Sequence, residues 1–149
     1  MKILLLLITP IILFGQQRYS AKLAEYEGYY LLSSGFSSSS TDFLQLDIVR
    51  SEDTSKFAVR IHFFTDTLTN TLDEDVVCNI ETIKIIGDSL YFRSKKCSNE
   101  RYEFSGRFLV SSQELGAKDE NVLEGVLIHF VKDRLVRKRQ VTFEYSVGC

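Results

Sequence analysis

The stretch from Val122 to Val147, VLEGVLIHFVKDRLVRKRQVTFEYSV, constrains the fold more than any other part of the chain. In its second half apolar and polar residues alternate, with Val141, Phe143, Tyr145 and Val147 separated by Thr142, Glu144 and Ser146. A two-residue period is typical of a strand with one buried face, and a helix does not show it. The polar residues at 132–134 divide the stretch. We therefore predict two long strands joined as a hairpin.

The register of this hairpin follows from an expected three-residue loop at 132–134. Val131 then pairs with Leu135, Leu127 with Arg139, Gly125 with Val141 and Leu123 with Phe143. Apolar residues meet apolar residues along most of one face, which specifies a register where that face is buried. The face comprises Leu123, Leu127, Val131, Leu135, Val141, Phe143 and Tyr145. It also carries three polar exceptions, His129, Arg137 and Arg139.

Composition favours a single β-rich domain. The chain has 149 residues, enough to bury a core without a metal or a partner. Charged residues make up 26% and hydrophobic residues 44%, which argues against a disordered or fibrous chain. A single proline and many branched and aromatic residues suit the pleated surface of a sheet. A formal net charge of -2 gives no general reason to expect nucleic acid or an anionic membrane as partner.

The first fifteen residues, MKILLLLITPIILFG, have the form of an export signal. A single Lys2 precedes an apolar run from Ile3 to Phe14, which has the length of a signal-peptide core and is short for a membrane span. We predict cleavage after Gly15, a soluble mature protein of residues 16–149, and a secreted or periplasmic location. An uncleaved membrane anchor is the alternative that the short run disfavours.

Export makes the three cysteines informative, because thiols outside the reducing cytosol tend to pair. Two strand-like runs lie between Cys78 and Cys97 and flank a turn at Gly87 and Asp88. Counting back from this turn places Cys78 and Cys97 opposite each other on the outer face, at a separation that a disulfide can span. Cys149 is then left over. The alternatives are that Cys149 pairs with one of the other two, or that all three are free.

Alternating patterns mark six further strands before the final hairpin. They are expected at 27–32, 43–50, 57–65, 76–86, 89–95 and 101–110, after a possible short helical turn within 16–25. The polar segment 33–42, with Phe36 its only large apolar residue, is expected to be a loop. Eight strands in chain order predict an all-β, up-and-down antiparallel barrel, with a two-sheet β-sandwich as the alternative.

This order of elements resembles the calycin superfamily, which includes the lipocalins, the fatty-acid-binding proteins and the avidins. Lipocalins carry Gly-x-Trp on the first strand, and here Gly28-Tyr29-Tyr30 occupies that place, in a chain without tryptophan. The resemblance covers most of the mature chain as topology and rests on these three residues as motif. It implies a single lipocalin-like domain that holds a small apolar or amphipathic molecule inside its barrel.

His129, Arg137, Arg139 and Tyr145 are the candidate ligand-binding residues. A cation on a buried face needs a partner, and a ligand carboxylate could supply one to Arg137 or Arg139, with Tyr145 as a neutral donor. The fatty-acid-binding proteins use an Arg and a Tyr on their last strands in this general manner. The competing interpretations are that both arginines reach outward into solvent and that His129 is structural.

Other polar clusters are weaker candidates. Arg134, Arg137, Lys138 and Arg139 form a basic run, but alternation sends Lys138 to the opposite face, which favours a solvated hairpin over a polyanion site. The acids at 73–75 lack the spacing of a calcium loop, so a hydrated loop is the better interpretation. His62 is expected to point outward. We recognise no catalytic motif, metal site or cofactor site, although scattered carboxylates can still meet in a fold.

The sequence therefore predicts an exported, non-enzymatic binding protein with a small apolar or amphipathic ligand in its barrel. The alternative is an extracytoplasmic module that binds or inhibits another protein through its surface loops, with segment 33–42 and Phe36 ordering on contact. No nucleic-acid partner is expected. The carrier hypothesis would fail if Phe57, Phe63, Phe104, Phe108 and Phe143 filled the interior completely.

Overall fold

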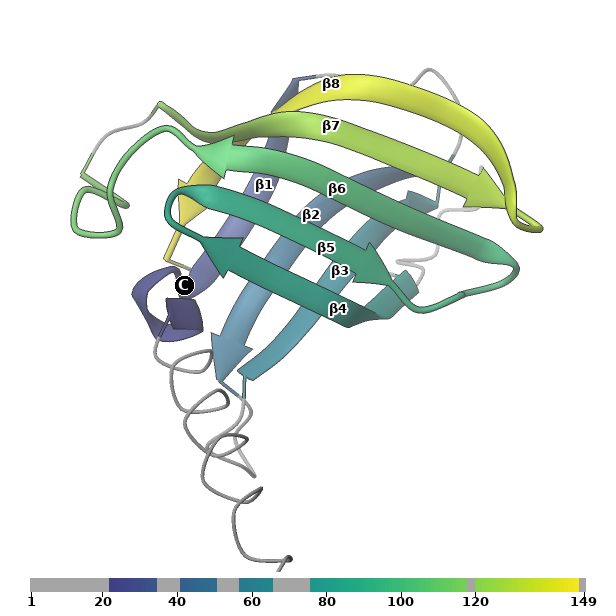
Figure 1. The fold of residues 1–149 in the computed structure, drawn as a ribbon, viewed down its shortest axis with the longest axis horizontal. Helices are drawn as coiled ribbons and strands as arrows, with labels where there is room; N and C mark the ends of the chain where they lie inside the picture. The colour runs from purple at the N-terminus through teal and green to yellow at the C-terminus, as the bar shows by residue number, and fades with distance from the viewer. Residues whose placement is uncertain (1–21, 35–40, 51–56, 66–75, 118–119, 148–149) are drawn as a thin grey trace, which may run out of the picture.

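Eight antiparallel strands close into one barrel in a computed structural model that describes residues 22–34, 41–50, 57–65, 76–117 and 120–147 (Figure 1). Each strand pairs with its neighbours in the chain, and β1 pairs with β8 to complete the ring. The strands are β1 (Gly28–Ser34), β2 (Thr41–Arg50), β3 (Phe57–Thr65), β4 (Val76–Ile86), β5 (Ser89–Ser94), β6 (Glu100–Phe108), β7 (Asn121–Val131) and β8 (Arg134–Ser146). The predicted all-β barrel is confirmed, the sandwich alternative is wrong, and the general shape is compatible with a lipocalin-like fold.

The strand boundaries agree with those expected from the sequence to within two residues. Differences of two residues occur at the end of β6 and at the first connection, where Ser33 and Ser34 extend β1 and Thr41 and Asp42 begin β2. This connection is therefore shorter than the expected loop at 33–42. The remaining part of that loop with Phe36, the proposed signal 1–15, the acids at 73–75 and Cys149 lie outside the described residues.

One end of the barrel is closed by the short N-terminal helical turn at residues 22–25, which confirms the expected turn (Figure 1). Leu23 and Tyr26 are 3% and 5% exposed, and the Tyr26 ring stacks on Phe108 with centroids 3.9 Å apart. The Tyr30 hydroxyl donates to the Tyr26 carbonyl oxygen at 2.8 Å. Apolar and aromatic side chains thus seal what we call the closed end. In the described residues, no helix has the length and apolar character needed to cross a membrane.

Side chains from every strand pack toward the barrel axis. The Phe104 ring lies 5.4 Å from that of Phe92 and 5.6 Å from that of Phe143, centroid to centroid. The same ring covers Gly106 and Gly125, which face each other across β6 and β7. A Cβ built on Gly125 would lie 2.6 Å from the Phe104 ring and 2.5 Å from the backbone of β6, so only glycine fits there. The closed half of the barrel is therefore a packed aromatic core.

The β7–β8 hairpin corrects the predicted turn. Pairing follows the expected register from Leu123 opposite Phe143 to His129 opposite Arg137. Beyond that point Phe130 pairs with Leu135 and Val131 pairs with Arg134, so Val136 is an extra residue in a β-bulge. The loop therefore has two residues, Lys132 and Asp133, both at positive φ as in the tight turns that hairpins favour. Leu135, expected in the buried face, is instead 60% exposed.

The Cys78–Cys97 disulfide is present, with the two Cα atoms 6.1 Å apart, but the predicted outer placement is wrong. Pairing between β4 and β5 shifts by one residue between Ile80 and Thr82, which leaves Glu81 as an extra residue. A one-residue shift reverses the faces of all residues beyond it. Cys78 therefore points into the barrel, where it is 1% exposed, and Cys97 lies beyond the end of β5.

Candidate functional site

The end of the barrel opposite Tyr26 carries a group of inward-facing polar residues. β6 begins here and β7 ends here, which places Glu100 and Tyr102 beside His129. β8 also begins here and brings Arg137 opposite His129 and Arg139 opposite Leu127. We call this the open end. Alternation explains the grouping, because each of these residues lies an even number of positions from a core residue on its own strand.

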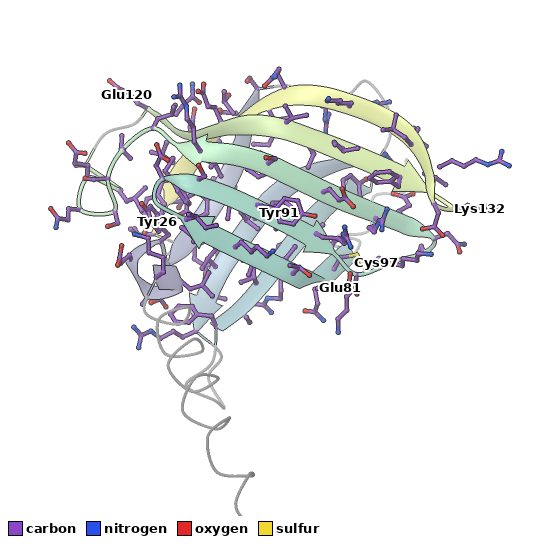
Figure 2. The ribbon with its side chains drawn as sticks, in the orientation of Figure 1. Tyr26, Glu81, Tyr91, Cys97, Glu120 and Lys132 are labelled. Atoms are coloured by element: carbon purple, nitrogen blue, oxygen red, sulfur yellow. A yellow bond between two sulfur atoms is a disulfide. The ribbon has the colours of Figure 1, made fainter. Side chains whose placement is uncertain are left out.

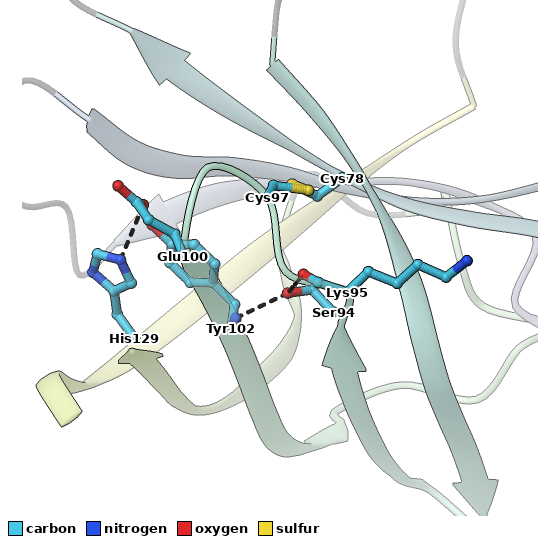
Figure 3. The surroundings of a disulfide bond; sticks show 7 residues. All are labelled: Cys78, Ser94, Lys95, Cys97, Glu100, Tyr102 and His129. Atoms are coloured by element: carbon cyan, nitrogen blue, oxygen red, sulfur yellow. Dashed lines mark hydrogen bonds and ion pairs between the residues drawn. A yellow bond between two sulfur atoms is a disulfide. The ribbon is translucent and has the colours of Figure 1, made fainter. Parts of the chain in front are cut away.

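Glu100, Tyr102 and His129 form a hydrogen-bonded cluster (Figure 3). Nε2 of His129 lies 3.0 Å from Oε2 of Glu100, and the Tyr102 hydroxyl donates to the same oxygen at 3.2 Å. The Tyr102 and His129 rings stack with centroids 4.4 Å apart and planes 5° apart. The side chains of His129 and Glu100 are 17% and 32% exposed, whereas Tyr102 is 2% exposed. Glu100 and His129 are therefore the members of the cluster that contact solvent.

The disulfide loop holds this cluster in place. Cys97 and Glu100 exchange backbone hydrogen bonds of 2.9 and 2.8 Å, which ties the start of β6 to the cystine. Ser94, 1% exposed, accepts a hydrogen bond from the backbone N–H of Tyr102 at 2.9 Å and donates to the Lys95 carbonyl oxygen (Figure 3). The cross-link between Cys78 and Cys97 thus fixes both the entry of β6 and the exit of β5.

The structure separates the four candidate ligand-binding residues. His129, Arg137 and Arg139 gather at the open end, and both arginines are half-buried. Tyr145 lies eight residues beyond Arg137 on β8, at the closed end, where its hydroxyl donates to the Glu27 carbonyl oxygen at 2.6 Å. Burial, followed by the nearby Glu27 carboxylate, raises the pKa of Tyr145. Tyr145 therefore belongs to the closed end, about 26 Å along the strand from Arg137.

Two members of the open-end group, Glu100 and Tyr102, were not among the candidates from sequence. The alternation from Tyr102 through Phe108 already assigns Glu100 to the inner face. Its proximity to His129 depends on the register between β6 and β7, which a strand pattern alone does not give. The sequence feature that could have identified Glu100 was therefore its place directly before the aromatic-rich strand expected at 101–110.

A second polar cluster lies on the outer face of β2 and β3. Oδ2 of Asp47 is 2.6 Å from Nε2 of His62, and Oδ1 of Asp47 accepts a hydrogen bond from the Gln45 amide. His62 points outward, opposite the buried Ile61, as expected. The Asp47 side chain is only 3% exposed, so its hydrogen bonds offset the desolvation of the carboxylate. Both carboxylate oxygens of Asp47 therefore have a hydrogen-bond partner in this cluster.

A surface hollow of about 540 Å³ lies over the outer face of β4 to β8. Tyr91 stands on one side and Gln140 on the other, and the backbones of Gly106 and Gly125 form part of the floor. The Arg107 guanidinium donates to Glu124 at 2.9 Å along the rim. This outer groove was not expected from sequence, because its lining residues come together only through the pairing of β4 to β8.

These two places have different chemical capacities. The open end combines two guanidinium groups with one carboxylate, a phenol and an imidazole, a set that suits an anionic group. The outer groove presents mixed polar side chains to solvent. Among the described residues, no three His, Cys, Asp or Glu side chains are placed to hold a metal ion. Comparison with protein-family models, with curated proteins and with solved structures finds no match to this chain.

Proposed function

We propose that this protein is an exported, lipocalin-like binding protein that holds a small amphipathic ligand at the open end of its barrel. The observation that carries this proposal is the placement of Arg137 and Arg139 on the inner face beside the Glu100–His129 pair. A guanidinium group in a half-buried site binds a carboxylate or phosphate oxygen strongly. The Cys78–Cys97 disulfide agrees with an oxidising compartment outside the cytosol.

The packed closed half limits the apolar part of such a ligand. Phe104, Phe108 and Phe143 are 1%, 3% and 0% exposed, and Phe57 is partly buried against the same core. The side chain of Phe63 lies outside the described residues. We therefore expect the ligand to lie at the open end, with its acid group at the arginines and a short tail directed toward the buried Leu127 and Val141.

The test uses residues 16–149 with octanoate, hexadecanoate and octanol. We expect both acids to raise the melting temperature and the uncharged alcohol to have no effect. Each buried methylene contributes about 0.8 kcal/mol, so a ligand that entered the whole barrel would bind more tightly as its chain lengthened. Equal affinity for the two acids is expected here, since the rings of Phe104 and Phe143 block a longer tail.

Arg139→Ala should weaken octanoate binding by tenfold or more, because a hydrogen bond to a charged group contributes roughly 1.5–3 kcal/mol. Arg107→Ala is the matched control: it removes the same charge from the outer face, where the Arg107 side chain is 63% exposed. Isothermal calorimetry on both variants gives the comparison. Equal weakening by the two substitutions, or no binding of either acid to the unaltered chain, would refute the proposal.

The outer groove supports a second candidate function, recognition of a protein partner by the barrel's outer face. Ser105→Trp would fill the floor of the groove without entering the barrel. If the groove is the recognition site, affinity purification from an envelope extract recovers a partner with the unaltered chain and loses it with Ser105→Trp. Recovery of the same partner by both chains would assign recognition to another surface.

A further inference from the structure

The tip of the β7–β8 hairpin, residues 130–138, exposes two adjacent aliphatic side chains. Leu135 is 60% exposed and Val136 is 54% exposed. In a regular strand two neighbouring residues point to opposite faces, so one of them would face the barrel. The β-bulge at Val136 breaks this alternation and presents both side chains to solvent. Figure 2 shows the tip, labelled at Lys132, at the far side of the molecule from Tyr26.

Exposed cations lie on the two loops at this end of the barrel. Within residues 95–99 and 130–138, five exposed cations accompany a single carboxylate, Asp133, although the whole chain has a formal charge of -2. The five are Lys95, Lys96, Lys132, Arg134 and Lys138. These five exposed cations thus belong to the end of the barrel that carries the apolar tip.

The two loops form one surface. Lys96 pairs with Asp133, and the backbone N–H of Lys132 donates to the Asn99 carbonyl oxygen at 2.9 Å. The Arg101 guanidinium lies 4.5 Å from the centroid of the Phe130 ring, just behind the tip. The ion pair brings Lys96 to the hairpin tip, where Lys132 and Arg134 lie directly before Leu135 in the chain. The ion pair and the backbone hydrogen bond therefore join the two short loops into one surface at the open end.

We propose that the β7–β8 tip docks the protein reversibly on an anionic lipid surface, with Leu135 and Val136 entering the boundary between headgroups and acyl chains. Two exposed aliphatic side chains at a tip that also carries Lys96, Lys132 and Arg134 suit interfacial insertion. A stable protein interface buries roughly 800 Å² of surface on each partner, whereas the exposed apolar part of this tip consists of two side chains. Docking would bring the open end of the barrel to the membrane. The inference does not depend on whether the barrel holds a ligand.

Vesicle sedimentation tests the proposal on residues 16–149. We expect binding to vesicles of phosphatidylcholine mixed with phosphatidylglycerol and much weaker binding to phosphatidylcholine alone. Binding should fall in about 1 M salt, where the screening length is about 3 Å. Equal binding to the two kinds of vesicle would contradict the electrostatic part of the proposal. Failure to bind either kind, or binding to soluble polyglutamate in place of vesicles, would overturn the proposal and favour an acidic protein partner.

Paired variants separate the two contributions. Lys132→Ala with Arg134→Ala should weaken binding to the anionic vesicles roughly 25-fold, whereas Lys84→Ala on the outer face should change it little. Leu135→Ser with Val136→Ser should abolish sedimentation. Its control is Ile86→Ser in the β4–β5 hairpin at the closed end, where Ile86 is 75% exposed. All these positions are exposed, so circular dichroism should confirm folding. Equal loss in tip and control variants would overturn the proposal.

Discussion

Two tyrosine hydroxyls at the closed end join the barrel to the segment directly before β1. Tyr30, 0% exposed, donates to Tyr26, and Tyr145 donates to Glu27, so β1 and β8 are both bound to the N-terminal segment. Buried hydroxyls of this kind are favourable only while they keep their proton and their partner. Burial, with smaller contributions from Tyr145 and Tyr26, raises the pKa of Tyr30 far above its usual value of 10.0.

This raised pKa predicts a loss of stability in alkali. Below pH 10 both the folded and the unfolded chain keep the Tyr30 proton. Above pH 10 the unfolded chain releases it while the folded chain retains it, so the unfolding free energy falls by about 1.4 kcal/mol per pH unit. Tyr30→Phe should cost about 1 kcal/mol at neutral pH and reduce this slope. Urea unfolding between pH 9 and 11 measures both, with Tyr29→Phe as control. An unchanged slope in Tyr30→Phe would contradict the assignment.

At the scale of the strands, the sequence was sufficient for element type and order. Alternating aromatic and branched residues gave every strand, and the short polar connections implied consecutive pairing. The errors lie at two β-bulges. In β4 the apolar alternation changes phase between Ile80 and Ile83, which is the visible trace of the bulge at Glu81. In β8 the residues around Val136 offer no such trace, so the exposure of Leu135 could not be predicted.

The candidate site could be predicted from the sequence only in part, because it depends on the register and position of paired strands. Parity along a strand assigns Arg137, Arg139 and His129 to the inner face, and the structure keeps them together. This alternation of side chains says nothing about distance along the barrel axis. The sequence pattern therefore grouped Tyr145 with residues that lie at the opposite end of the barrel. The contact of Glu100 with His129 joins β6 to β7 and depends on register across a long connection. A sequence pattern therefore predicts which face of the barrel a residue lies on more readily than its position along the barrel axis.

The disulfide provides the test at this scale. Cys78→Ala with Cys97→Ala opens a loop of about 20 residues and should lower the unfolding free energy by about 3 kcal/mol, mainly by freeing the unfolded chain. Denaturant unfolding of the oxidised parent and the double variant measures the difference. Cys149→Ala should leave stability unchanged if Cys78 and Cys97 pair with each other. A similar loss in Cys149→Ala would indicate a different pairing in solution.

At the scale of the whole molecule, the two ends of the barrel have different compositions. The closed end is sealed by Leu23, Tyr26 and Phe108, which are all nearly inaccessible to solvent. The open end carries cations, a carboxylate and an imidazole, and its loops are basic and partly apolar. A closed barrel has no free strand edges, so contacts with other molecules must come from its ends or its outer face. Stability should depend on the closed end and binding on the open end.

This division predicts opposite effects for two substitutions. Tyr26→Ala removes a buried ring stacked on Phe108 and should cost about 3–5 kcal/mol of stability, while octanoate affinity stays the same. Arg139→Ala should weaken octanoate binding while changing stability by less than about 1 kcal/mol. Thermal unfolding and calorimetry measure the two effects. If Tyr26→Ala is too unstable to purify, Tyr26→Leu keeps part of the packing and tests the same point. Parallel loss of stability and affinity in both variants would mean that the two ends act as one unit.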